Sequence, residues 1–349
     1  MKVVVDDKIP FIREPLEQLA DEVLYLRGAD ICRSDLMDAD ALIVRTRTMC
    51  NAQLLEGTKV TFIATATIGY DHLDTAYLDS RGISWSNCPG CNATSVGQYL
   101  KSCLLLLERE RGMNLAHTTI GLVGVGHVGS AVQRALAPLG LRILLNDPPR
   151  EALQAAAGQA EDTFCSLQTL AEQCDIISFH TPLTRTGNHP TYHLADARFM
   201  DSLQRQPILI NTSRGAVVDN EALWQALCCG KVSDAIIDTW EHEPNINQKL
   251  LHHIYIGTPH LAGYSADGKA NATTMALQAL CRHFNLAPSF TVTPPRLSEQ
   301  GVLPPTDADD KTLALCLYNP HHDSQLLKAN PGKFEEYRGN YPLRREVWD

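Results

Sequence analysis

The apolar residues of the first ninety positions are gathered into short runs that alternate with longer amphipathic stretches. Four of these runs are rich in β-branched or aromatic side chains, at residues 2–5, 41–44, 60–63 and 83–85. Runs of this length and composition are typical of buried strands. Their alternation with helical stretches predicts a parallel α/β sheet.

A long amphipathic helix is predicted directly after the Pro89-Gly90 dipeptide. The apolar residues there recur at spacings of four, seven, eight and eleven, which places them on one helix face. They are Val96, Leu100, Cys103, Leu104 and Leu107. Gly112 marks the predicted end of this helix.

A second α/β series begins at Thr118, and helical segments separate most of its predicted strands. These strands are residues 119–123, 142–145, 175–179, 208–210, 234–237 and 254–256. A further helix is predicted from Gly263 to about Asn285. A chain of 349 residues is long enough for two or three domains of this kind.

The character of the chain changes after Leu286. Five prolines predict a linker, because each removes a backbone donor and disfavours helix in the residue before it; they are Pro288, Pro294, Pro295, Pro304 and Pro305. Residues 312–317 then form one predicted strand, followed by an amphipathic tail. This last stretch is too short to fold alone, so we expect it to dock on another chain.

Charge and composition exclude several classes of protein. The formal net charge of −10 argues against binders of nucleic acid or of anionic membranes, which need a basic face. No apolar run approaches the ~18 residues of a membrane span. The first residues also lack the pattern of a signal peptide. We therefore expect a cytoplasmic protein.

The eleven cysteines of such a chain indicate reduced thiols rather than a disulfide framework. Cys88 and Cys91 have Cys-x-x-Cys spacing, which also occurs in redox dithiols and zinc sites. No second pair of ligands accompanies them, so we interpret the segment as a turn built on Pro-Gly and expect no metal.

A glycine motif follows the predicted strand 119–123. Gly124, Gly126 and Gly129 fit Gly-x-Gly-x-x-Gly, with His127 and Val128 at the variable positions. The three glycines serve a tight turn, close approach of a pyrophosphate and helix–strand packing. Eighteen residues beyond the motif, Asp147 ends the next strand. A carboxylate there binds ribose hydroxyls and repels a 2′-phosphate, which favours NAD over NADP. Because Arg150 lies three residues further on, the sequence does not predict that NAD is used exclusively.

Candidate catalytic residues come directly after other strands, where a doubly wound sheet binds its ligands. Oxidising an alcohol needs a base for the hydroxyl proton, and His260 suits this task near neutral pH. Glu243 is placed to orient the imidazole and to favour its charged form. Arg214 supplies the planar cation that a substrate carboxylate needs. His180, which also ends a strand, is the rival candidate for the base.

The segments around these residues resemble the D-isomer-specific 2-hydroxyacid dehydrogenase family, over nearly the whole chain to about residue 285. The resemblance implies a Rossmann-type doubly wound parallel sheet, residues 95–263, inserted into a flavodoxin-like α/β substrate domain, residues 1–94 and 264–285. A closer match to one branch of the family lies in residues 65–72, 89–94, 146–150, 214–220 and 257–264. Arg214, Glu243 and His260 match the catalytic residues of the family.

One branch of the family, which acts on a phosphorylated hydroxy acid, resembles the chain further. It implies a homodimer held by a small C-terminal α+β dimerisation domain at residues 286–349. It also implies that Thr46, Thr67 and Tyr264 contact substrate. The residues that should line NAD are Asp147, Thr181, Thr212, Ser213, Arg214, Asp238 and Gly263.

A phosphorylated substrate is also expected from the residues themselves. Arg45, Thr46 and Arg47 follow a strand of the first domain and together form a possible anion cradle; the alternative is a solvated loop.

Other functions stay open, namely a dehydrogenase for phosphoglycerate, glyoxylate or lactate, and an NAD-sensing protein without turnover. The branch often has an acidic residue where this chain has Gln98, and residues 185–190 form an insertion. Arg344 and Arg345 are placed to reach across a dimer.

Overall fold

The computed structural model describes residues 1–158 and 163–348, and the chain divides into two compact units. The first unit comprises residues 1–92 and 265–302, and the second comprises residues 93–264 and 303–348. Within the described ranges, no helix has both the length and the hydrophobicity that crossing a membrane requires.

The first unit is built on five parallel strands in the order β2-β1-β3-β4-β5, which is the flavodoxin-like order. The strands are β1 (Lys2–Asp6), β2 (Glu22–Leu26), β3 (Ala41–Val44), β4 (Phe62–Thr65) and β5 (Ser84–Ser86). The four predicted strands are confirmed within two residues. The sequence analysis missed β2, which lies at the edge of the sheet and is only partly buried.

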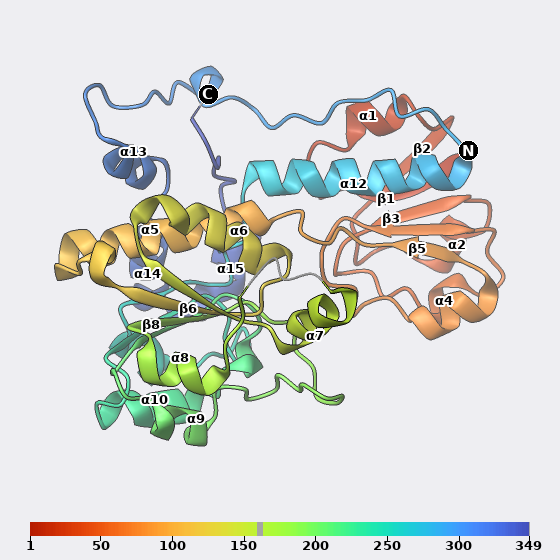
Figure 1. Cartoon of the computed structure of the whole chain (residues 1–349). Helices are drawn as coiled ribbons and strands as arrows, with labels where there is room; N and C mark the ends of the chain where they lie inside the picture. The colour runs from red at the N-terminus through yellow and green to blue at the C-terminus, as the bar shows by residue number, and fades with distance from the viewer. Residues whose placement is uncertain (159–162, 349) are drawn as a thin grey trace. The chain divides into compact units, whose positions relative to one another are not determined.

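Helices cover both faces of this sheet (Figure 1). One face packs against α1 (Arg13–Glu17) and α12 (Ala266–Phe284). The other packs against α2 (Arg33–Leu36), α3 (Ala52–Leu55) and α4 (Thr75–Arg81). The helix α12 confirms the predicted helix near residues 263–285, and it ends where Asn285 adopts a left-handed conformation.

The Cys-x-x-Cys segment is a turn, as predicted. Gly90 has a φ of 78°, and the Cys91 amide donates to the Cys88 carbonyl at 3.3 Å. Burial raises the pKa of Cys88 to about 12 and that of Cys91 to about 11, so both thiols stay protonated. All eleven cysteines are free, which confirms the prediction of reduced thiols.

The second unit contains six parallel strands in the order β11-β10-β9-β8-β6-β7. They are β6 (Thr119–Val123), β7 (Arg142–Asn146), β8 (Ile176–Phe179), β9 (Ile208–Asn211), β10 (Asp234–Ile237) and β11 (Ile256–Gly257). A single parallel bridge from Leu145 to Phe164 continues the sheet beyond β7. The order is that of a Rossmann-type sheet, and all six predicted strands are confirmed.

Two helical layers flank this sheet. One face carries α5 (Ala93–Arg111), α6 (His127–Leu136) and α13 (Asp310–Leu317). The other carries α8 (Leu167–Gln173), α9 (Ala197–Ser202), α10 (Asn220–Cys228) and α11 (Gln248–His253). The helix α7 (Pro148–Ala157) follows β7, and α14 (Pro320–Ala329) and α15 (Phe334–Gly339) complete the unit. Short 3-10 turns are η1 (Leu115–His117), η2 (Ala137–Leu139), η3 (Gly215–Val217) and η5 (Pro331–Lys333), with η4 (Ser298–Gln300) in the first unit.

The prediction of a strand at residues 312–317 is wrong, because this segment is the helix α13. Asp309 caps the helix by accepting a hydrogen bond from the Thr312 amide at 2.8 Å. The buried residues are Leu315 and Tyr318, spaced three apart, which is a helical period and not the alternation of a strand.

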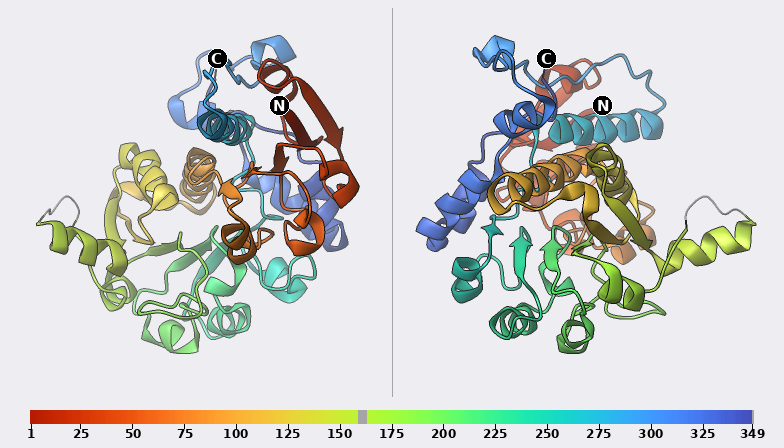
Figure 2. Two further views of the ribbon diagram at one scale, coloured as in Figure 1. Left: turned by 90° about the vertical axis from the view of Figure 1, so that its right-hand side faces the viewer. Right: turned by 60° about the vertical axis from the view of Figure 1, so that its left-hand side comes forward.

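The C-terminal segment is helical and packs on the second unit (Figure 2). Leu327 of α14 and Phe334 of α15 are buried in the same core as the helices α8 to α11. The Gly257 amide at the sheet edge donates to the Ser324 hydroxyl at 3.0 Å. Residues 303–348 thus form part of the second unit; that residues 286–349 serve dimerisation stays a prediction.

Candidate active site

The glycine loop between β6 and α6 has the geometry of a dinucleotide site. Gly124 has a φ of 87°, and a side chain there would meet the His180 backbone at 2.9 Å. A Cβ at Gly129 would lie 2.0 Å from the Gly124 carbonyl oxygen. At Gly126 nothing lies within 4 Å, so this position faces open space at the start of a ten-residue helix. A pyrophosphate needs that space and that helix end.

A cavity of about 730 Å³ opens beyond the ends of β6, β7 and β8. Its walls are mainly apolar and include Pro148, Phe164 and Leu194. The Thr181 hydroxyl oxygen, at the same cavity, is buried and has no hydrogen-bond partner in the described part of the chain. An apolar cavity with an unsatisfied hydroxyl fits the adenosine half of NAD.

Asp147 stands between the glycine loop and this cavity. One carboxylate oxygen accepts from the Val125 amide at 2.7 Å, and the other accepts from the Arg150 amide at 3.0 Å. The side chain therefore fixes the loop and caps α7. Residues 189 and 190 of the insertion and Thr191 directly after it also line the cavity, and hydrogen bonds between Thr184 and Thr191 join the two ends of the insertion. The insertion thus contributes to the cavity wall.

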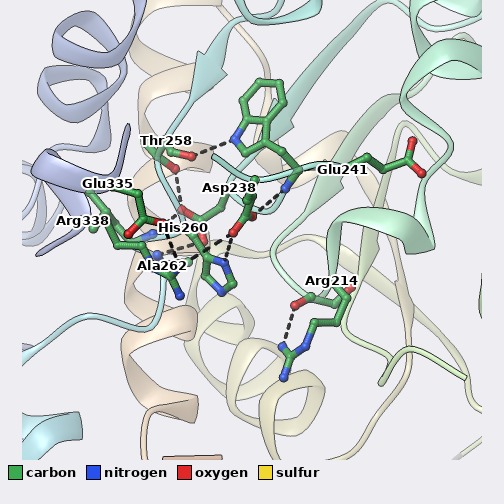
Figure 3. Close-up of polar contacts among 12 residues, drawn as sticks. Arg214, Asp238, Glu241, Thr258, His260, Ala262, Glu335 and Arg338 are labelled. Atoms are coloured by element: carbon green, nitrogen blue, oxygen red, sulfur yellow. Dashed lines mark hydrogen bonds and ion pairs between the residues drawn. The ribbon is translucent and has the colours of Figure 1, made fainter. Parts of the chain in front are cut away.

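His260 and Glu243 form a hydrogen-bonded pair. The Nδ1 atom of His260 lies 2.9 Å from Oε2 of Glu243, and the Trp240 amide donates to Oε1 of Glu243 at 2.9 Å (Figure 3). Burial by itself would raise the pKa of Glu243, but the bonds and charges of His260, Trp240 and Arg338 outweigh it, so this pKa is lowered. The carboxylate stays ionised and orients the imidazole.

Asp238 holds the loop that carries His260. Its buried carboxylate accepts from the Thr258 hydroxyl and the Leu261 amide, each at 2.6 Å, and from the Ala262 amide at 3.0 Å. The His260 amide donates to the Asp238 carbonyl at 2.8 Å. This bonding is needed because His260 adopts a φ of 59°, which is unfavourable for a residue other than glycine. Burial raises the pKa of Asp238.

Arg344 holds the same loop from the C-terminal tail. Its guanidinium donates to the carbonyl oxygens of Leu261, Ala262 and Tyr264 and to the side chain of Gln98. The guanidinium also lies 3.9 Å from the Tyr318 ring centroid. The expectation that Arg344 reaches across a dimer is wrong, because its donors are used within this chain. Gln98, which stands where the branch often has an acidic residue, accepts a hydrogen bond from Nε of Arg344.

Arg214 follows β9 and is exposed, and one of its Nη atoms donates to the Ser213 carbonyl at 2.8 Å. The Asn211 side chain fixes its backbone by donating to the Arg214 carbonyl at 3.0 Å. A Cβ at Gly215 would lie only 1.8 Å from the Trp240 carbonyl oxygen. The loop of Arg214 therefore packs directly on the loop of Glu243. Figure 3 shows Arg214 and Glu241, one residue from each loop, in the same region.

A second cluster joins these two loops. His193 lies 2.7 Å from Oε1 of Glu241 and 3.4 Å from Oδ2 of Asp219, and its amide donates to the Ala216 carbonyl at 2.7 Å. The ligand types and spacing would suit a metal ion. However, Glu241 also accepts from the Asn220 amide, and Asp219 caps α10. We interpret the cluster as a clamp between the two loops.

His180 is poorly suited to be the base. Burial lowers its pKa to about 3, so the imidazole is neutral and weakly basic. Its ring nitrogens lie 3.0 Å from the Ser178 hydroxyl and 3.3 Å from the Thr212 hydroxyl. Its backbone packs under Gly124, so His180 supports the glycine loop.

The other residues expected to contact NAD lie on the same strand ends. His127 and Val128 begin α6, Ser213 donates to the Asn211 side chain at 2.9 Å, and Gly263 lies in the loop that Arg344 holds. That these residues line NAD stays a prediction.

Two of the residues expected to contact substrate in the first unit already make polar contacts within the protein. Arg45 donates to the buried carboxylate of Asp6 at 3.1 Å, and Thr67 lies 2.7 Å from the Thr65 hydroxyl. Thr46 and Arg47 are exposed after β3. The ion pair to Asp6 commits part of the Arg45 guanidinium to the fold. The anion cradle stays a prediction.

Comparison with known proteins identifies the family. The model for the D-isomer specific 2-hydroxyacid dehydrogenase NAD-binding domain matches residues 101–262. Erythronate-4-phosphate dehydrogenase of Bacteroides fragilis is 53% identical over 346 residues, covering 99% of this chain and 97% of that protein. Its counterpart in Porphyromonas gingivalis is 42% identical over 353 residues, covering 99% and 94%. The chain belongs to the erythronate-4-phosphate dehydrogenase family.

Solved structures agree on the fold. TT0316 of Thermus thermophilus has a TM-score of 0.65 at 27% identity, covering 84% of this chain and all of that one. Aquifex aeolicus D-lactate dehydrogenase, complexed with NAD and lactic acid, has a TM-score of 0.63 at 24% identity, covering 82% and 96%. With the family model and the relatives above, the chain is an NAD-dependent dehydrogenase of the D-2-hydroxyacid type, and its glycine loop and cavity fit that cofactor.

Proposed function

We propose that this chain oxidises 4-phospho-D-erythronate at C2 to 2-oxo-3-hydroxy-4-phosphobutanoate, with NAD as the oxidant, in pyridoxine biosynthesis. The observation that carries the proposal is the 53% identity over 346 residues to enzymes named for this substrate. The hydrogen-bonded pair of Glu243 and His260 supports it, because alcohol oxidation needs an oriented base.

His260 takes the proton of the C2 hydroxyl. Its Nδ1 atom is held by Glu243, which leaves Nε2 as the atom that faces the substrate. As the C2–H bond breaks and the C=O bond forms, the hydroxyl proton moves to Nε2, and Glu243 stabilises the imidazolium that results. Bound NAD supplies the acceptor for the hydride.

Arg214 binds the substrate carboxylate beside C2. A guanidinium forms two parallel hydrogen bonds to a carboxylate and so fixes the orientation of C2 toward the cofactor. Arg214 is exposed on a backbone fixed by Asn211, and its planar guanidinium offers a fixed fork of N–H donors. Charge on the developing carbonyl oxygen is stabilised by the same group.

The remaining contacts follow from the family. Asp147 binds the ribose of NAD, at the cavity where it stands, and the N-terminus of α6 binds the pyrophosphate. Thr46, Thr67 and Tyr264 contact the substrate, and Arg45 and Arg47 attract its phosphate. We also propose a homodimer and a cytoplasmic location for the enzyme.

The proposal is tested by measuring NADH formation across a panel of acids. The panel contains 4-phospho-D-erythronate, D-erythronate, 3-phospho-D-glycerate, D-lactate and glycolate, each with NAD and with NADP. We expect the highest kcat/KM for 4-phospho-D-erythronate with NAD. A higher kcat/KM for another acid would assign the chain to that substrate, and no NADH from any acid would contradict a dehydrogenase function.

A further inference from the structure

The C-terminal helix α15 brings a second arginine to the catalytic pair. An Nη atom of Arg338 lies 3.9 Å from Oε2 of Glu243, which is the oxygen bonded to His260. In Figure 3, Arg338 approaches the pair from the side of the C-terminal helices, and Arg214 lies on the other side of His260. The ion pair with Glu243 therefore places the Arg338 guanidinium beside the catalytic pair.

Part of the hydrogen-bonding capacity of Arg338 is not used by the contacts of the described chain. A guanidinium has five N–H donors. The contacts to Glu243 at 3.9 Å and to Glu335 at 4.0 Å are ion pairs beyond hydrogen-bond length. The Nε atom is buried and has no hydrogen-bond partner among residues 1–158 and 163–348. The Tyr264 hydroxyl interacts with the guanidinium as well.

A partly buried guanidinium with a donor that has no partner is suited to bind an anionic ligand. The Arg338 side chain is 30% exposed, so it has lost most of its hydration, yet part of it still reaches solvent. Desolvation is unfavourable unless the donors find partners. The contact with Glu243 is long and single, so a doubly charged ligand would replace it at small cost in free energy.

The position of Arg338 along the chain points to the substrate phosphate. Residue 338 lies outside residues 101–262, which match the NAD-binding domain common to 2-hydroxyacid dehydrogenases. The relatives named for a phosphorylated acid align over 99% of this chain. The solved structures, among them a D-lactate dehydrogenase, align over only 81–84% of it, although 95–100% of their own chains is covered. This chain and the relatives named for a phosphorylated acid therefore share a length of chain that those solved structures do not cover.

We propose that Arg338 binds the phosphate of the substrate, so that the C-terminal segment determines the preference for a phosphorylated acid. The inference rests on the proposed function and adds a residue to it. A phosphate carries a charge of about −1.5 to −2 at pH 7 and three acceptor oxygens, and so it needs more than one cation. Arg338 supplies one that the second unit carries itself.

The test compares the variants Arg338→Gln and Arg338→Lys with wild type on 4-phospho-D-erythronate and on D-erythronate. The control is Lys333→Gln, which removes an exposed cation five residues earlier in the same segment. For Arg338→Gln we expect kcat/KM for the phosphorylated acid to fall about 10- to 100-fold, as for a lost charge-assisted contact, and mainly through KM. The value for D-erythronate should stay within twofold, and Arg338→Lys should recover part of the loss.

An equal loss on both acids would overturn the proposal, because Arg338 would then act only by orienting Glu243. Wild-type kinetics on both acids would overturn it too. Binding of inorganic phosphate to the enzyme–NADH complex, measured by titration calorimetry, gives a readout independent of turnover. Weaker phosphate binding by Arg338→Gln supports the anion site even if wild type fails to oxidise 4-phospho-D-erythronate, and such a failure would refute the proposed function alone.

Discussion

Replacing Gly215 by alanine tests whether the packing of two loops controls catalysis. The new Cβ would lie 1.8 Å from the carbonyl oxygen of Trp240 and 2.0 Å from its carbonyl carbon. Ordinary contact begins near 3.4 Å, so the loop of Arg214 and the loop of Glu243 must separate by roughly 1.5 Å. Both obstacles are backbone atoms, so no side chain can rotate away to relieve the clash.

A displacement of this size separates groups that must act together on one substrate. Misplacing a catalytic group by about 1 Å costs about a hundredfold in rate, or about 2.7 kcal/mol of transition-state free energy. We therefore expect Gly215→Ala to lower kcat for NADH formation about a hundredfold. The affinity for NAD should fall by a smaller factor than kcat, because only some of the residues expected to line NAD lie on the displaced loop, whereas the glycine loop lies on other strands of the sheet.

The assay is steady-state kinetics at saturating NAD and substrate, together with NAD binding by titration and the melting temperature by circular dichroism. Gly332→Ala is the matched control, because nothing lies within 4 Å of the Cβ added there. A folded Gly215→Ala enzyme with wild-type kcat would refute the claim that these loops must stay in contact.

Three further predictions concern single side chains. Glu243→Gln should lower kcat about 10- to 100-fold, because the imidazolium loses its charged partner. The pKa of Glu243 is lowered from 4.5 in the folded protein. The stability contributed by its charge is therefore fully present above pH 4.5, and it is lost as the pH falls through the pKa of the folded state. Arg344→Met should lower the free energy of unfolding by at least about 3 kcal/mol, because several buried carbonyls lose a charged donor. Gly126→Ala should leave the melting temperature unchanged and raise the KM for NAD at least about tenfold, because its Cβ would fill space that the pyrophosphate needs.

Each of these predictions has a clear contrary result. For Glu243, urea unfolding of wild type and variant should give a stability difference that is constant between pH 6 and 8 and shrinks below about pH 4. A stability difference that stays constant as pH falls through the whole acid range would contradict a contribution from the charge of Glu243. An Arg344→Met protein as stable as wild type would show that the tail does not hold the His260 loop. Unchanged NAD kinetics in Gly126→Ala would place the pyrophosphate elsewhere.

Local sequence signals predicted the parts of the fold that depend on local structure. The buried strands β3 and β6 were predicted to the residue, because each is a short apolar run between polar stretches. The partly buried edge strand β2 was missed, since an edge strand lacks the continuous apolar signal of a central one. The helix α13 was mistaken for a strand because leucines alternate at residues 313, 315 and 317, whereas the core contacts only the face of Leu315 and Tyr318.

The candidate site was predictable to the extent that it lies at strand ends. Glu243 and His260 follow β10 and β11, which are neighbours in the sheet, so the topology alone brings them together. Arg338 and Arg344 could not be found in this way. They come from a helix and a tail whose docking depends on tertiary contacts with α5 and the His260 loop, and no local pattern encodes such contacts.

The most direct test of the account is the kcat of His260→Asn at saturating NAD and 4-phospho-D-erythronate. Asparagine keeps a polar group of similar size but removes the base. The account predicts that kcat falls between about a hundredfold and ten-thousandfold, while the Kd for NAD stays within twofold of wild type. A kcat within threefold of wild type would contradict the assignment of His260 as the group that takes the hydroxyl proton.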